Sequence, residues 1–141
     1  MQARDEARGF IDELARFPHA IHSMRIVADW ADGSAIGYIV RLVSSAAEIL
    51  GWGHARWRVG GAAELSWETH PSHRGHGYTR EAAPLFVAEL FTRPDVREVH
   101  AWIPESDSAS QGVAIACGMT PTDAPGGVFQ KWVREERRPI L

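Results

Sequence analysis

ELSWETHPSHRGHGYTREA, residues 64–82, is the stretch from which the fold of this chain can be predicted. Residues 64–70 alternate, with Leu65, Trp67 and Thr69 on one face and polar side chains on the other. A period of two residues is typical of a strand with two unlike faces. Pro71 should end that strand, because proline has no N–H to give to a ladder.

A glycine loop and the start of a helix follow this strand. Gly75 and Gly77 allow the backbone to turn tightly and to approach a ligand closely. Residues 78–82 then open an apolar run with helical spacing. A loop of this kind leaves several N–H groups unpaired at the positive end of the helix dipole. The sequence therefore predicts a site suited to phosphate or pyrophosphate.

The stretch resembles the GNAT superfamily of acyl-CoA-dependent N-acetyltransferases, and most closely its ribosomal-protein-alanine acetyltransferase-like branch. That branch carries the pattern E-I-G-Y-x-L-x-P-x-x-x-G-x-G-Y-A-T-E-A. The residues that match it in register, without a gap, are Glu64, Pro71, Gly75, Gly77, Tyr78, Glu81 and Ala82. Downstream, the family's N-x-x-S…G-F/M appears as Asp107-Ser108-Ala109-Ser110…Gly118-Met119. The two blocks cover roughly the C-terminal half of the chain.

Composition narrows the functional classes. The chain has 141 residues, enough for one domain with a real core. Its net charge of −3 gives no general attraction to nucleic acid or to an anionic membrane. Cys117 is the single cysteine, so a reducing, cytoplasmic location is expected. The N-terminus shows no signal-peptide pattern, and no apolar run approaches the roughly 20 residues of a membrane-spanning helix.

Periodicity and turn residues predict the other elements. In chain order these are a helix over 2–16, strands over 23–30 and 35–43 joined by a turn at Asp32-Gly33, a helix from 78 to about 91, a strand over 96–103, a short helix from Asp107 or Ser108 to Cys117, and a strand over 128–133. Residues 46–61 are ambiguous between a helical turn and an irregular strand, with a turn at Gly60-Gly61. Mixed strands and helices fit an α/β layer fold. The resemblance implies one domain over 1–141, a twisted mixed β-sheet flanked by helices on both faces, with an acyl-CoA-binding core at about 62–120.

The resemblance also implies a site for acetyl-CoA as co-substrate. Backbone N–H groups of the loop would hold its pyrophosphate, and Arg74 could add a charge contact. The loop residues concerned are Arg74, Gly75, His76, Gly77, Tyr78 and Thr79. Trp67, Glu68 and Thr69 would pair with the pantetheine arm where two strands splay apart. Asp107 stands where the family has asparagine, and an ionised carboxylate can only accept hydrogen bonds.

Acetyl transfer to an amine needs a base for the amine and a proton donor for the thiolate. Glu64 is the first candidate base, acting through water, followed by Glu68 and His70. The alternative for Glu64 is a solvated strand face. Many superfamily members have a tyrosine acid where this chain has Ala114, so Ser110 is the remaining candidate donor. Its alternative role is to satisfy a backbone N–H at a helix start.

Two other readings of the residues are weaker. His70, His73 and His76 recur every third residue, but they lie on a loop without a fixed face and without a supporting cysteine or carboxylate cluster. A metal site is therefore not expected. Six tryptophans could stack on bases, but no basic stripe accompanies them, so core and interface packing is expected.

The segment before Ser23 is shorter than in the family, with one predicted helix and no strand. A homodimer is therefore expected to complete the sheet or the pocket. The favoured interpretation is an N-acetyltransferase acting on a protein N-terminus or a small-molecule amine. The alternative is a catalytically degenerate domain that binds acyl-CoA or a protein partner without turnover. A third class is a structural domain that binds no CoA.

Overall fold

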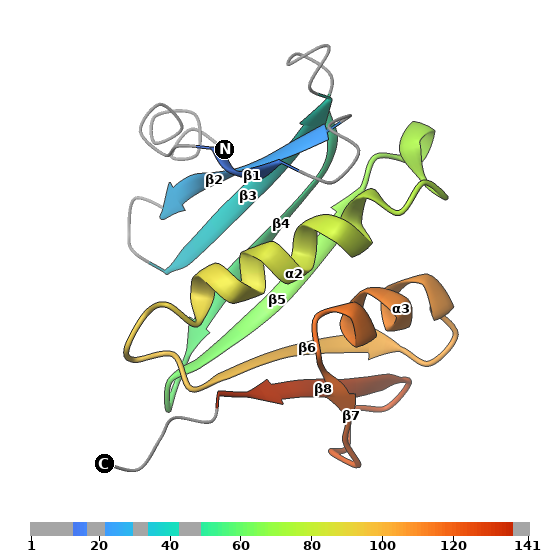
Figure 1. The fold of residues 1–141 in the computed structure, drawn as a ribbon. Coiled ribbons are helices and arrows are strands. Elements are labelled where there is room, and N and C mark those ends of the chain that lie inside the picture. Colours follow the sequence, from blue (N-terminus) through green and yellow to red (C-terminus); the bar gives the residue numbers. More distant parts are fainter. Residues whose placement is uncertain (1–12, 17–21, 30–33, 43–48, 137–141) are drawn as a thin grey trace.

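A computed structural model describes residues 13–16, 22–29, 34–42 and 49–136. They form a sheet of eight strands in the order β1-β2-β3-β4-β5-β6-β8-β7, together with two α-helices (Figure 1). The strands are β1 (Glu13–Arg16), β2 (His22–Asp29), β3 (Ala35–Leu42), β4 (Ile49–Arg58), β5 (Ala62–Thr69), β6 (Glu98–Pro104), β7 (Thr120–Pro121) and β8 (Phe129–Glu135). The helices are the 3-10 turn η2 (Pro71–His73) and the α-helices α2 (Tyr78–Leu90) and α3 (Ser108–Ala116).

The sheet is mixed, because β5 and β6 run parallel while the other neighbouring strands are antiparallel. The predicted α/β class with a mixed sheet is confirmed. The pairing of β5 with β6 is short and ends at Glu64 and His100. Beyond that point β5 remains paired with β4 as far as Thr69, and β6 remains paired with β8 as far as Pro104. The two central strands therefore part at Glu64 and expose facing backbone edges.

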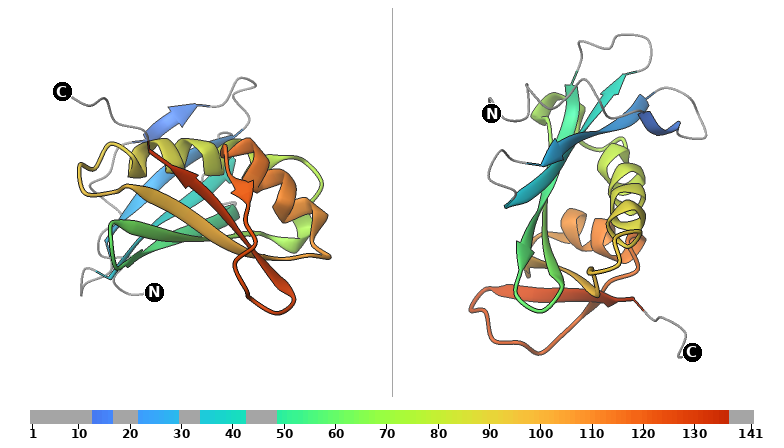
Figure 2. Two further views of the ribbon diagram at one scale, coloured as in Figure 1. Left: turned by 90° about the horizontal axis from the view of Figure 1, so that it is seen from below. Right: turned by 90° about the vertical axis from the view of Figure 1, so that its left-hand side faces the viewer.

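Both described α-helices lie on the same face of the sheet (Figure 2), so the expectation of helices on both faces is not met by the described residues. The buried side of α2 is fully excluded from solvent at Ala82, Ala83, Phe86, Val87 and Leu90, as its apolar spacing predicted. These side chains join Ala63 and Leu65 of β5 in one hydrophobic cluster. Since successive side chains of a strand alternate between faces, Glu64 points away from the helices.

The N-terminal prediction needs correction. The helix predicted for 2–16 is wrong at its end, because Glu13–Arg16 form β1, which pairs antiparallel with β2. Backbone pairing with β2 outweighs the helical pattern at Glu13–Arg16. Most of the apolar residues of that pattern lie before Glu13. Residues 2–12 lie outside the described residues. A strand thus precedes the hairpin, so the argument that a partner must supply one is wrong, and the homodimer stays a prediction.

The other elements follow the prediction with small changes of boundary. Residues 49–58 of the ambiguous segment form β4, which has strand partners on both sides. Gly60 and Gly61 make the turn that follows, with φ of 81° and 78°. The two-residue strand β7 was not predicted, because so short an element has no periodicity. The expected turn at Asp32-Gly33 lies outside the described residues. No helix among those described is long and apolar enough to span a bilayer.

Candidate active site

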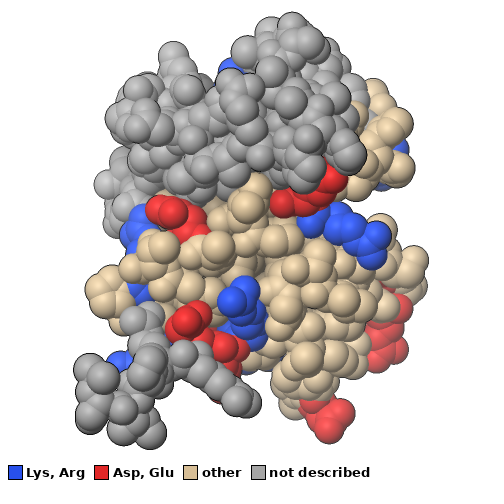
Figure 3. Space-filling model, viewed as in Figure 1, with Lys and Arg blue, Asp and Glu red and all other residues tan. Residues whose placement is uncertain are grey.

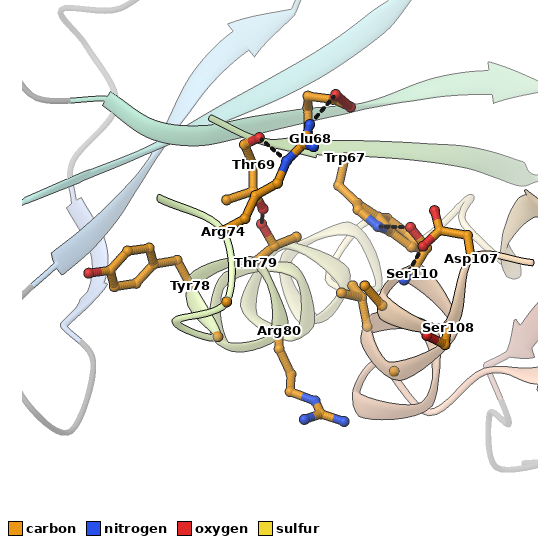
Figure 4. A pocket seen from close by; sticks show the side chains of 15 residues that line it. Trp67, Glu68, Thr69, Arg74, Tyr78, Thr79, Arg80, Asp107, Ser108 and Ser110 are labelled. Atoms are coloured by element: carbon orange, nitrogen blue, oxygen red, sulfur yellow. Dashed lines mark hydrogen bonds and ion pairs between the residues drawn. The ribbon is translucent and has the colours of Figure 1, made fainter. Parts of the chain in front are cut away.

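A cavity of about 610 Å³ lies on the helix-bearing side where β5 and β6 part (Figure 4). Its walls are the end of β5, the glycine loop and the first turns of α2 and α3. The predicted site residues that line it are Trp67, Glu68, Thr69, Arg74, Gly75, Gly77, Tyr78, Thr79, Asp107 and Ser110. Glu64 and His76 are the predicted site residues that do not line it. Two segments far apart in the sequence thus converge on one cavity.

The glycine loop leaves room for a ligand beside its backbone. Gly75 and Gly77 have φ of 84° and 77°, a region that side-chain-bearing residues rarely adopt. A Cβ added at either glycine would have no described atom within 4 Å. Gly77 is also the N-cap of α2, and it offers no side chain to the orphan N–H groups of the first turn. The loop therefore fits a pyrophosphate through backbone donors.

Polar side chains tie this loop to the end of β5. The Arg74 guanidinium donates from Nε to the carbonyl oxygen of Thr69 over 3.3 Å and lies 3.7 Å from the Glu68 carboxylate. The hydroxyl groups of Thr69 and Thr79 are hydrogen-bonded to each other. Arg74 is thus held at the edge of the cavity with its remaining donors free to meet an anion. Glu68 is engaged in this ion pair, which weakens its candidacy as a base.

The opposite wall is the first turn of α3. Asp107 caps the helix, accepting a hydrogen bond from the Ser110 N–H over 3.0 Å. The Trp67 indole reaches across the cavity from β5, and its Nε1–H donates to Ser110 Oγ over 3.3 Å (Figure 4). Because Ser110 Oγ accepts from the indole, its own O–H remains available for donation into the cavity.

Ala114 does not reach this wall. It is fully buried in the hydrophobic cluster, and it is not among the cavity-lining residues of α3. A larger side chain at this position would therefore have to displace core packing. The hydroxyl-bearing residues that α3 brings to the cavity are Ser108 and Ser110, and Ser110 is the one that the resemblance pointed to.

Arg80, in the first turn of α2, also lines the cavity and was not predicted. Its Nη2 would lie only 3.0 Å from a Cβ at Gly112, so the glycine allows the guanidinium to lie against α3. Two features of the sequence could have indicated this contact. They are the basic residue Arg80 just after the glycine loop and Gly112 inside the following helix. Their proximity depends on the packing of α2 against α3, which sequence patterns do not reveal.

Glu64 lies outside the cavity, on the other face of the sheet. Its carboxylate is 3.0 Å from Arg58 Nη2 and 3.3 Å from His100 Nε2. The hydrogen bond from Arg58 is the main cause that lowers the pKa of Glu64 below its ordinary value, against the opposing effect of partial burial. Glu64 therefore belongs to an ion-paired cluster, and not to the solvated strand face given as the alternative to its role as a base. The structure does not bring Glu64 and Ser110 together in one cavity.

The histidines of the loop have local roles. His70 Nδ1 accepts from the Ser72 N–H at the start of η2, over 3.2 Å. The His76 ring stacks on Tyr78, with ring centroids 5.4 Å apart. In the described part of the chain, no group of three or more His, Cys, Asp or Glu side chains is arranged to hold a metal ion. On the helix-bearing face, basic and acidic side chains lie beside one another among uncharged ones (Figure 3).

Comparison with known proteins agrees with this geometry. Residues 2–120 match the acetyltransferase (GNAT) domain family. A search of curated proteins finds no significant match. Among solved structures, a Vibrio cholerae protein described as a ribosomal-protein-serine acetyltransferase is similar with a TM-score of 0.65 and 17% identity, over 76% of this chain and 67% of that one.

Two further structures show the same fold with a ligand. RimL, a ribosomal L7/L12 alpha-N-protein acetyltransferase in complex with coenzyme A, has a TM-score of 0.61 and 17% identity, over 74% of this chain and 63% of that one. The spermidine N-acetyltransferase of Vibrio cholerae, in complex with CoA and spermine, has a TM-score of 0.59 and 13% identity, over 73% of this chain and 65% of that one. The chain spans about two thirds of the length of these structures.

Proposed function

Because the chain belongs to the acetyltransferase (GNAT) domain family, we propose that it is an N-acetyltransferase that moves an acetyl group from acetyl-CoA directly to an amine. The observation that carries this proposal is the parting of β5 and β6 beside an open glycine loop. The loop suits a pyrophosphate, and the free strand edge suits an extended amide-bearing arm. The pyrophosphate and the amide-bearing pantetheine arm are the two parts of acetyl-CoA that precede its thioester.

Each part of the cavity has a proposed role in holding the co-substrate. The backbone N–H groups that follow Gly77 hold the pyrophosphate, and Arg74 supplies a positive charge beside it. The edge of β5 at Trp67 and Thr69 pairs with the pantetheine arm, as an added strand would. Arg80 supplies a second positive charge, between α2 and α3.

The reaction requires two proton movements. An ammonium acceptor loses one proton, the resulting amine nitrogen bonds to the acetyl carbon, the carbon–sulfur bond breaks, and the sulfur takes the second proton of that nitrogen. Ser110 is proposed as the donor at the sulfur, because its hydroxyl already accepts a bond from Trp67. Glu64 is proposed as the group that receives the first proton, from the other face of the sheet.

The proposed acceptor is a protein N-terminus or a small-molecule amine. The similar structures include an enzyme named for a ribosomal protein and one bound to spermine. The nearby carboxylates of Glu64 and Glu98 each have a cationic partner, Arg58 and Lys131 respectively, so this cluster does not by itself select a cationic acceptor.

A second candidate is a domain that binds acyl-CoA without turnover. Two observations favour it. Ala114 is buried in the core where the resemblance expects a tyrosine acid, and the Asp107 carboxylate is occupied in capping α3. Ser110 is then the hydroxyl on which turnover depends.

Incubation with acetyl-CoA and a panel of amines separates these candidates. The panel contains peptides with different N-terminal residues, spermidine and lysine, with thiol release followed in solution and the acetylated product identified by mass. The proposal predicts thiol release that depends on one class of amine. If the protein binds acetyl-CoA but leaves every amine unmodified, the domain without turnover is correct.

A further inference from the structure

We infer that Arg80 binds the 3′-phosphate of coenzyme A and thereby distinguishes the coenzyme from its 3′-dephospho form. This inference rests on the proposed acetyl transfer and adds to it a second anion subsite, apart from the glycine loop. Its basis is a guanidinium that lines the cavity, has space beside α3, lacks a described partner and occupies a position unfavourable for a cation.

The charge of Arg80 is not compensated within the described part of the chain. Arg80 is exposed and lines the cavity. Among the described residues, none forms an ion pair or a hydrogen bond with its side chain. Arg74, by contrast, is held by the Glu68 carboxylate and the Thr69 carbonyl oxygen. An anion that enters the cavity can therefore pair with Arg80 without first breaking a contact among these residues.

Arg80 also lies where a helix favours negative charge. Gly77 is the N-cap of α2, so Arg80 is the third residue of the helix and belongs to its first turn. The positive end of the helix dipole makes a cation unfavourable there. A phosphate bound by the guanidinium would offset this repulsion and would itself be stabilised by the dipole. The position of Arg80 is thus unfavourable in the free protein and favourable once an anion is bound.

The surface of α3 leaves room for the Arg80 side chain. Gly112 lies inside α3, and a Cβ at this position would be 3.0 Å from Arg80 Nη2. A glycine inside a helix is less favourable than an alanine, so a close approach of another group is a physical reason for it. A methyl group here would press the guanidinium away from α3. Gly112 therefore lets Arg80 lie between the two helices that wall the cavity.

The direction of the Arg80 side chain indicates which phosphate it meets. In Figure 4 the Arg74 side chain points toward the end of β5, whereas that of Arg80 points away from this strand. Under the proposed function, the pyrophosphate lies at the N–H groups after Gly77, and the pantetheine arm runs from it along β5 toward Ser110. The adenosine is joined to the other end of the pyrophosphate, so it leaves the loop on the side of Arg80. Its ribose carries the 3′-phosphate, which a guanidinium can bind through two N–H groups.

Calorimetric titration with coenzyme A and with 3′-dephospho-coenzyme A tests the inference without requiring turnover. The wild type should bind coenzyme A about tenfold more tightly than the dephospho form. Arg80→Gln should weaken the binding of coenzyme A alone, so that the two ligands bind equally. Arg74→Gln should weaken both ligands by the same factor, because it acts on the pyrophosphate that they share. Arg97→Gln is the matched control that should change neither affinity, since Arg97 is exposed and does not line the cavity.

Equal binding of the two ligands by the wild type would overturn the inference alone, as would a preference that persists in Arg80→Gln. The melting temperature of the free protein is a second readout. Arg80→Gln should not lower it, because the substitution removes a cation from the positive end of α2. A lower melting temperature with an unchanged preference would make Arg80 a structural residue and overturn the inference. No binding of either ligand by the wild type would overturn the proposed function, and the inference with it.

Discussion

Glu64 of β5 and His100 of β6 are partners at the last paired position of the two strands, and Glu64 Oε1 lies 3.3 Å from His100 Nε2. This contact is on the face away from the helices. On the helix-bearing face, the same parting of strands opens into the cavity between the glycine loop and α3. Under the proposed function, coenzyme A and the acceptor amine approach from opposite faces of one sheet and meet where β5 and β6 separate.

The hydroxyl of Ser110 should matter for turnover more than for binding. A hydrogen bond to a charged group contributes about 1.5–3 kcal/mol, and about 1.4 kcal/mol corresponds to a tenfold change in rate. Ser110→Ala should therefore lower kcat about 10- to 100-fold while the affinity for CoA stays close to that of the wild type. Trp67→Phe, which keeps the serine and removes the indole donor, should have the smaller effect on kcat. An unchanged kcat in Ser110→Ala would exclude Ser110 as the donor.

Asp107 should stabilise α3 through its cap. The carboxylate accepts the Ser110 N–H, and loss of an N-cap side chain typically costs about 1 kcal/mol. Asp107→Ala should lower the free energy of unfolding by about that amount, whereas Asp107→Asn should nearly preserve it. Urea denaturation of the three proteins measures this. Equal losses in the two variants would show that the cap is not what the side chain contributes.

The ion pair between Glu64 and Arg58 should make stability depend on pH. The folded-state pKa of Glu64 lies below its ordinary value of 4.5. The ionised carboxylate therefore stabilises the fold fully above the unfolded-state pKa, and this contribution is lost as the pH falls through the folded-state pKa. The difference in unfolding free energy between wild type and Glu64→Gln should be largest near neutral pH and shrink in acid. Chemical denaturation across this range would show a constant difference if the pair contributed nothing.

The packing of α2 on the sheet should depend on Phe86. Its side chain is fully buried, and its ring centroid lies 4.5 Å from that of Tyr38 on β3. Phe86→Ala should lower the free energy of unfolding by about 3–5 kcal/mol, because it leaves a cavity under the helix. Phe129 is 45% exposed, so Phe129→Ala should change stability by less than about 0.5 kcal/mol. Similar losses for both would contradict the assignment of the core.

Local signals in the sequence were sufficient for the centre of the fold. The alternation of β5, the proline after it and the two glycines predicted the strand, the loop and the start of α2, because each signal acts within a few residues of its effect. The same is true of Asp107 and Ser110 at the start of α3. These segments bring most of the predicted binding residues into one cavity.

Contacts between distant strands could not be predicted in the same way. The pairing of Glu64 with His100 depends on the parallel register of β5 and β6, which no local pattern determines. Glu64 was selected from the resemblance alone, and its partners Arg58 and His100 were missed. Strand β1 was missed because an edge strand of four residues is defined by its neighbour β2 more than by its own sequence.

Calorimetric titration with acetyl-CoA of the wild type, Gly77→Trp and Gly60→Trp tests the central claim most directly. Gly77 and Gly60 have φ of 77° and 81°, and neither would have a described atom within 4 Å of an added Cβ, so the two substitutions impose similar backbone strain. Of these two glycines, Gly77 lines the cavity and Gly60 does not. The account predicts a dissociation constant between about 1 µM and 1 mM for the wild type, the same range for Gly60→Trp, and no binding for Gly77→Trp. Absence of binding by the wild type, or equal binding by the two variants, would contradict it.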